Sequence, residues 1–84
     1  MKFEKLKPGM FLVSTVRLRG WLLIKDKQRN KIIVDNYWTG SSGRFYKIYN
    51  MELKEYEWNI SYKLGTTKDA QDLIVALFYE GLIK

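Results

Sequence analysis

The chain has 84 residues and a net charge of +6, with 46% hydrophobic and 15% aromatic residues and no cysteine or histidine. A chain this short has interior enough for one hydrophobic core, so we expect residues 1–84 to form a single domain. The missing side chains exclude disulfides, thiolate nucleophiles and the usual ligands of zinc, copper and haem. We therefore expect neither a metal site nor a cofactor.

The apolar runs of the chain are short. The longest are residues 10–13 and 21–24, whereas a helix needs about 20 apolar residues to cross a bilayer. The N-terminal residues Met1-Lys2-Phe3-Glu4-Lys5 do not resemble the apolar segment of a secretory signal. We expect a cytoplasmic protein without a membrane partner.

The first half of the chain has the pattern of an antiparallel meander. Pro8 and Gly9 predict a tight turn, because proline fixes φ and glycine tolerates a positive φ. Alternating apolar and polar residues predict a half-buried strand over residues 10–19, followed by strands over 21–26 and 31–38. The polar run 26–30 is the turn between the last two strands, with Asn30 expected in a left-handed conformation.

The second half contains two more predicted strands. Residues 39–43 are small and polar, which predicts an exposed loop before a fourth strand over residues 44–50. Residues 56–63 alternate strictly between large apolar and polar side chains and give the clearest strand pattern of the sequence, the fifth. A bulge or bend near Lys54 and Glu55 is expected, because without it the apolar side chains of the two segments would face opposite sides of the sheet.

One amphipathic helix is predicted over residues 68–80. A threonine at its N-cap and the carboxylates of Asp69 and Asp72 suit the positive end of a helix dipole. Gly81 is expected to form a left-handed C-terminal cap, with Leu82 folding back on Leu77. The residues predicted to face the core are Ala70, Leu73, Ile74, Leu77 and Phe78.

Five short strands and one helix indicate an α+β fold. We expect a small five-stranded antiparallel sheet with a C-terminal amphipathic helix. A barrel of the SH3-like or OB-like type is the expected closed form, because closure protects edge strands. An open twisted sheet with the helix across one face is the alternative.

Catalysis has little support in this sequence. Glu52, Glu55 and Glu57 cluster at a strand edge, where acidic side chains are usually solvated. The segment Gly40-Ser41-Ser42-Gly43 lacks the lysine and the following helix of a phosphate-binding loop. We expect no catalytic residues and no enzymatic activity.

The charge is segregated along the chain. Residues 1–47 carry eleven Lys and Arg against three acids, a net +8, and residues 48–84 carry four against six, a net −2. A segregated positive field attracts polyanions, so the predicted function is a non-enzymatic nucleic-acid-binding module that contacts the phosphate backbone through a basic sheet face. DNA and RNA are not distinguished. The expected contacts are Arg17, Arg19, Lys25, Lys27, Arg29, Lys31, Arg44 and Lys47.

Aromatic residues are interleaved with these cations. The candidates for base stacking, or for a protein interface, are Tyr37, Trp38, Tyr46 and Tyr49. Phe45, Ile48, Trp58 and Ile60 are expected in the core instead. The alternative function is a small protein interaction module, a regulator or inhibitor encoded by a phage or other mobile element. Its anchor would be Tyr37, Trp38 and the Gly40–Gly43 loop, and an acidic protein surface would be a suitable partner.

Overall fold

The computed structural model describes residues 2–15, 19–58 and 62–82, and of Arg19 only the backbone. Its strands are β1 (Phe11–Ser14), β2 (Arg19–Lys27), β3 (Lys31–Thr39), β4 (Phe45–Lys54) and β5 (Tyr62–Leu64). One helix, α1 (Thr67–Tyr79), follows β5, and two short 3-10 turns are η1 (Phe3–Lys5) and η2 (Glu55–Glu57).

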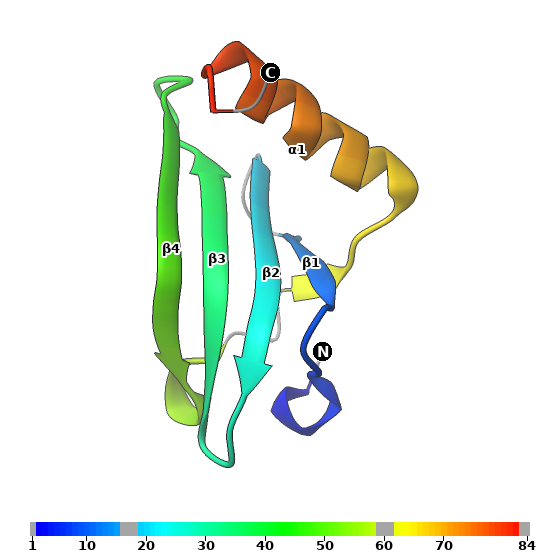
Figure 1. The fold of residues 1–84 in the computed structure, drawn as a ribbon, viewed down its shortest axis with the longest axis vertical. Helices are drawn as coiled ribbons and strands as arrows, with labels where there is room; N and C mark the ends of the chain where they lie inside the picture. The colour runs from blue at the N-terminus through cyan, green and yellow to red at the C-terminus, as the bar shows by residue number, and fades with distance from the viewer. Residues whose placement is uncertain (1, 16–18, 59–61, 83–84) are drawn as a thin grey trace.

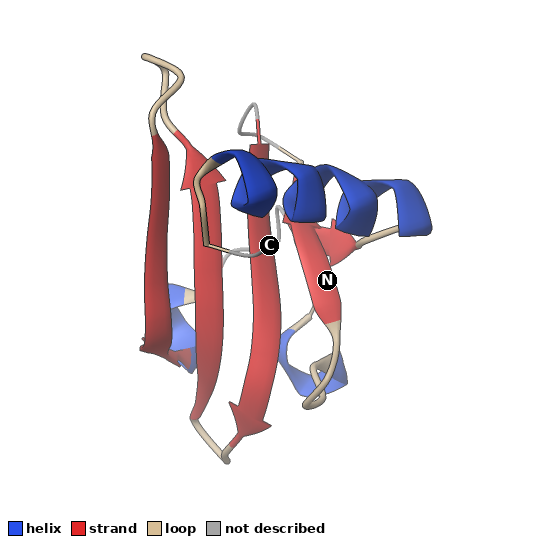
Figure 2. Ribbon diagram, turned by 45° about the horizontal axis from the view of Figure 1, so that its top comes forward, coloured by secondary structure: helices blue, strands red, loops and turns tan. Residues whose placement is uncertain are grey.

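The strands form one antiparallel sheet in the order β4-β3-β2-β1-β5, so the α+β class with a five-stranded sheet and a C-terminal helix is confirmed. β4 and β5 are its two edges. Within the described residues these edges do not pair with each other, so the sheet is not closed and the expected barrel is not confirmed. α1 crosses one face near one end of the strands (Figures 1 and 2).

Alternating side chains give the sheet two apolar sides. On the side that carries α1, the helix side, Val13, Trp21 and Tyr37 are buried with Leu73 of the helix. On the opposite side, the N-terminal side, Phe3 and Leu6 close over the strands. The sheet residues buried beneath them are Leu12, Leu22, Ile24, Ile32 and Val34. The chain therefore covers a single sheet on both faces, with α1 on one and the N-terminal segment on the other.

The turn and meander predicted for the first half are confirmed. Gly9 has a φ of +88°, and the amide of Met10 donates to the carbonyl of Lys7 at 3.2 Å, which closes the predicted turn. β1, β2 and β3 pair in sequence order. Asn30 does not take the expected left-handed conformation; among the described non-glycine residues Asn50 does, with a φ of +54°.

The first predicted strand is shorter than expected. β1 ends at Ser14, and β2 begins at Arg19 where residues 10–19 were predicted as one strand. Residues 16–18 of that prediction lie outside the described part of the chain. β1 lies between β2 and β5, and its pairing with the three-residue β5 runs from Leu12 to Ser14.

The fifth predicted strand is wrong over residues 56–58, which form the end of η2 and its C-cap, and it is confirmed over residues 62 and 63. β4 continues to Lys54, because Met51 and Leu53 pair with Val34 and Ile32 and pack on the N-terminal side. The chain then turns in η2, where a Glu57 carboxylate oxygen accepts from the Lys54 amide at 3.1 Å. Residues 59–61 lie outside the described part, and β5 covers only residues 62–64.

The change of facing in β4 occurs earlier than residues 54–55. A bulge places both Tyr49 and Asn50 opposite Asp35, because Asn36 pairs with Ile48 while Val34 pairs with Met51. Asp35 is only 8% exposed, and its Oδ1 accepts from the Asn50 amide at 3.0 Å. Lys25 completes the site, since its Nζ lies 2.8 Å from Asn50 Oδ1 and 3.8 Å from Asp35 Oδ1. These contacts fix the bulge.

The helix begins and ends as its caps predict. The Thr66 hydroxyl accepts from the Asp69 amide at 3.2 Å, and Asp69 Oδ2 accepts from the Thr66 amide at 2.8 Å. At the other end Gly81 has a φ of +73°, and the Leu82 amide donates to the Leu77 carbonyl at 3.0 Å. Both ends thus satisfy backbone groups that a helix leaves without partners.

The buried stripe of α1 is narrower than predicted. Leu73, Ala76 and Leu77 pack on the sheet, whereas Ile74 and Phe78, which were expected in the core, are 53% and 59% exposed. The helix crosses the strands close to one end of the sheet (Figure 1), so only one narrow row of side chains finds a partner surface.

Candidate nucleic-acid interface

Two of the expected phosphate contacts are engaged by carboxylates. Lys25 contacts Asp35 and Asn50 at the β4 bulge. Lys31 Nζ lies 2.8 Å from Glu52 Oε1 on the neighbouring strand. This contact holds the pKa of the Glu52 carboxyl below its ordinary value, through the Lys31 hydrogen bond first and its charge second. These two lysines are therefore already partnered within the fold.

The other described candidates do not share one location. Arg29 is exposed in the turn before β3, and Arg44 is exposed after the loop that follows β3. A strand of nine residues separates them, which corresponds to about 30 Å. Lys47 is exposed on the edge strand β4, and Lys27 lies against η1, with its Nζ 4.6 Å from the centre of the Phe3 ring.

The side chains of Arg17 and Arg19 lie outside the described part of the structure. Arg17 lies outside the described residues. Arg19 is placed by its backbone, which pairs with Thr39 at the end of β3 that leads into the Gly40–Gly43 loop. Of the eight expected cations, the six with described side chains are thus distributed over both ends and the middle of the sheet.

The four aromatic candidates differ sharply in exposure. Tyr37 is buried under α1, and desolvation, followed by the charges of Tyr49 and Asp35, raises the pKa of its hydroxyl to about 12. Trp38 is half-buried and stacks on Tyr46 of β4, with ring centroids 5.2 Å apart and planes 14° apart. Tyr46 and Tyr49 are exposed on β4. The accessible aromatic surface therefore lies along the β4 edge.

Ile48 and the three other residues expected in the core have mixed positions. Phe45 and Trp58 pack against the two clusters as predicted. Ile48 is 43% exposed, because it lies on the edge strand and, like Tyr46, faces the side of the sheet that α1 does not cover. Ile60 lies outside the described residues.

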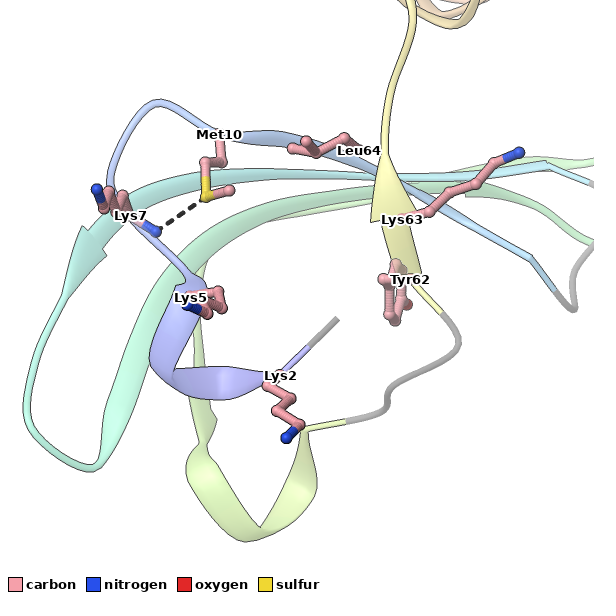
Figure 3. A pocket seen from close by; sticks show the side chains of 7 residues that line it. All are labelled: Lys2, Lys5, Lys7, Met10, Tyr62, Lys63 and Leu64. Atoms are coloured by element: carbon pink, nitrogen blue, oxygen red, sulfur yellow. Dashed lines mark hydrogen bonds between the residues drawn. The ribbon is translucent and has the colours of Figure 1, made fainter.

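A basic site that the sequence reading missed lies at the N-terminal end. Lys2, Lys5 and Lys7 line an open pocket of about 790 Å³ together with Met10, Tyr62, Lys63 and Leu64 (Figure 3). The pairing of β5 with β1 brings residues 62–64 beside the first turn of the chain, although more than fifty residues separate them in sequence. Lys63 extends away from the other lysines in this view, so it contributes its aliphatic stem.

The floor of this pocket is apolar and its rim is cationic. Met10 packs against the N-terminal cluster, and its sulfur lies 3.0 Å from the Lys7 amide nitrogen (Figure 3). Tyr62 stacks on Trp58, with ring centroids 5.4 Å apart. Among the described residues, no carboxylate lies within ion-pair distance of Lys2, Lys5 or Lys7. Phosphate and aromatic groups of a ligand would thus find complementary partners here.

Comparison of the chain with known protein families, curated proteins and solved structures finds no match. Among the described residues, no group of three or more Asp or Glu side chains is placed to hold a metal ion. No helix in that part of the chain is long and apolar enough to cross a membrane.

One signal for the N-terminal lysines was present in the sequence. Lys2, Lys5 and Lys7 account for three of the eleven cations in the basic half, and they precede the Pro8-Gly9 turn. Their convergence with Tyr62 depends on the long-range pairing of β1 with β5, which periodicity cannot reveal.

Proposed function

We propose that the protein is a non-enzymatic module that binds nucleic acid, with the N-terminal lysine pocket as its main contact. The observation that carries this proposal is the gathering of Lys2, Lys5 and Lys7 around one apolar floor without carboxylate partners among the described residues. Ammonium groups neutralise phosphates, while Met10 and Tyr62 offer an apolar surface to bases.

Two further features support a polyanionic ligand. The chain carries a net charge of +6, so its long-range field favours anions. Lys27 is held against the same N-terminal segment, since its Nζ lies 3.4 Å from the Leu6 carbonyl oxygen and over the Phe3 ring. Lys27 is thus the expected phosphate contact that lies against the N-terminal segment, although it does not line the pocket. The compartment we propose, the cytoplasm, would give access to such ligands.

The proposal is tested by the salt dependence of binding. Labelled single-stranded and double-stranded DNA and RNA are titrated with the protein from about 50 to 200 mM salt, and the slope of log K against log salt is measured. Each neutralised phosphate contributes roughly −0.7 to −0.9 to this slope. The triple variant Lys2→Gln, Lys5→Gln, Lys7→Gln should therefore flatten the slope by about 2.

A matched control uses lysines that already have partners. The double variant Lys25→Gln, Lys31→Gln removes two charges of the same sign but leaves the pocket intact, so its slope should stay close to that of the unmodified protein. Absence of binding by the unmodified protein at low salt would remove the proposal. A larger loss in the control than in the pocket variant would move the contacts to the sheet.

A second candidate function, a protein interaction module, is favoured by a different observation. The outer side of α1 exposes four large apolar residues, and monomeric soluble proteins seldom expose such a contiguous apolar row to solvent. They are Ile74, Val75, Phe78 and Tyr79, with 53%, 52%, 59% and 82% of their surfaces exposed. A partner protein would cover this row, with Trp38 and Tyr46 as a separate aromatic surface on the other side of the sheet.

The two candidate functions predict that different variants lose binding. For protein binding, Phe78→Ser should release a co-purifying partner whereas the triple lysine variant should retain it. For nucleic-acid binding, Phe78→Ser should leave affinity unchanged.

A further inference from the structure

β4 is the longest strand of the sheet and lies at its edge. It spans ten residues, and Figure 1 shows no described element beyond it on the outer side. Tyr46, Ile48 and Tyr49 are 38%, 43% and 49% exposed, so this long edge carries exposed apolar side chains beside its charged ones. Such an edge presents unpaired backbone donors and acceptors that another strand can complete.

The bulge at Tyr49 and Asn50 makes this edge symmetric. Tyr49 and Asn50 together occupy one position opposite Asp35. Because of this extra residue, Ile48 and Met51, which are three residues apart, face the same side of the sheet. Tyr46 and Ile48 therefore share a side of the sheet with Met51 and Leu53, because all four pair with residues of the N-terminal side or its continuation. On the helix side Lys47 lies next to Ile48 before the bulge and Glu52 lies next to Met51 after it, with Phe45 and Lys54 on the same side at the two ends of β4.

We propose that two copies of this chain pair antiparallel along β4, with a two-fold axis at the bulge. Counting outward from the axis, Ile48 then lies opposite Met51 of the second copy, and Lys47 lies opposite Glu52. One step further, Tyr46 lies opposite Leu53. Over residues 46–48 and 51–53 this register matches apolar side chains on one side and opposite charges on the other, so this part of β4 is complementary to itself.

The self-complementarity identifies a second copy as the occupant of the edge. An unrelated strand would have to supply this order of an acid, an apolar residue and a base, whereas the reversed β4 already supplies it. Two-fold pairing also makes each contact twice, as in the commonest class of protein dimers. The contact of Glu52 with Lys31 holds the carboxylate on the helix side, where Lys47 of the second copy would reach it.

Charge exchange tests the pairing. Sedimentation is measured without nucleic acid for the unmodified chain, for Lys47→Glu, for Glu52→Lys and for an equimolar mixture of the two variants. Each variant alone turns both Lys47–Glu52 contacts into like-charge contacts, so its dimerisation Kd should rise about tenfold or more. In the mixture both contacts are again between opposite charges, and dimers should return.

Lys63→Glu is the control, because it changes a charge by the same amount on the opposite edge strand and should leave the dimer intact. An unmodified chain that stays monomeric up to about 1 mM overturns the proposal. A mixture that stays as monomeric as its components also overturns it. This experiment contains no nucleic acid, so its outcome is separate from that of the salt titration.

Cysteine cross-linking provides a second measurement should either charge variant fail to fold. The chain has no cysteine, so introduced thiols have no competing partner. A mixture of Ile48→Cys and Met51→Cys should form a disulfide between copies, because directly opposed residues lie within the range of that bond. Each variant alone should cross-link much less, since its thiols are offset by two strand positions. Equal cross-linking in all three samples contradicts the register.

Discussion

Replacing Asp35 by alanine is expected to destabilise the domain substantially, because this buried carboxylate fixes the β4 bulge. Its Oδ1 accepts from the Asn50 amide at 3.0 Å, a charge-assisted hydrogen bond worth about 1.5–3 kcal/mol. The contact with Lys25, at 3.8 Å and with 43% of that side chain exposed, adds less than about 1 kcal/mol. Desolvation of the carboxylate offsets part of this sum.

We therefore expect Asp35→Ala to lower the free energy of unfolding by roughly 1.5–3 kcal/mol, measured by urea denaturation. The corresponding fall in Tm is about 6–24 °C for a domain of this size. Asp35→Asn is the matched control, because its amide oxygen can still accept from Asn50 while the charge is lost. It should be the milder change, and it should also lower the pKa of Tyr37, which the Asp35 charge helps to raise.

Two results would refute this reasoning. If Asp35→Ala changed stability by less than about 0.5 kcal/mol, the buried hydrogen bond would not be what fixes the bulge. If Asp35→Asn were as damaging as Asp35→Ala, the charge and not the hydrogen bond would dominate.

Three further substitutions test separate parts of the fold. The pKa of Tyr37 is about 12 in the folded protein against an ordinary value of 10, so the unfolded chain loses this proton at a lower pH than the folded protein does. The free energy of unfolding should therefore fall between pH 10 and 12. In urea titrations over this alkaline range, Tyr37→Phe should reduce the slope of the unfolding free energy against pH by up to about 1.4 kcal/mol per pH unit. Gly65→Ala should lower the free energy of unfolding by about 1–3 kcal/mol, because the added Cβ would overlap the Phe11 ring. Gly9→Ala should lower it by only about 1 kcal/mol, because its Cβ meets no atom within 4 Å and only the φ of +88° is unfavourable. Equal losses of stability in the two variants would contradict the overlap with Phe11. Thr66→Ala should lower stability by about 1 kcal/mol. It should also raise the pKa of Asp69 in part, because it keeps the Thr66 amide, the main cause that holds this pKa below its ordinary value, and removes the hydroxyl donor, the second cause; an unchanged Asp69 titration by NMR would contradict the hydroxyl contact.

Local features of the fold were predictable from the sequence because neighbouring residues determine them. Pro8 and Gly9 specify their turn, and Thr66, Asp69 and Gly81 specify the ends of α1. The antiparallel meander of β1 to β3 likewise follows from alternation and short connections. In each case the partners of the backbone groups lie within a few residues or on the next strand.

Features that depend on distant partners were not predictable. The alternation of Tyr56 and Trp58 resembles a strand, but η2 turns the chain so that Trp58 packs beneath the N-terminal side. Ile74 and Phe78 have the spacing of core residues, but α1 crosses the strands near one end of the sheet, which leaves these two side chains exposed (Figure 1). The bulge depends on Asp35, which the sequence presents as an ordinary charge in a strand.

The candidate site has the same limitation. The excess of cations in the first half was visible in the sequence, and it supported a polyanionic ligand. Which cations are accessible depends on tertiary contacts, since Lys25 and Lys31 contact carboxylates while Lys2, Lys5 and Lys7 line the pocket beside Tyr62.

The salt dependence of nucleic-acid binding tests the central proposal most directly. For the unmodified protein, affinity should fall steeply and linearly on logarithmic axes, and replacing Lys2, Lys5 and Lys7 by glutamine should flatten the slope by about 2. An affinity that does not change with salt concentration would contradict the proposal that the N-terminal pocket binds a phosphate backbone. A slope that these three replacements leave unchanged would contradict it as well.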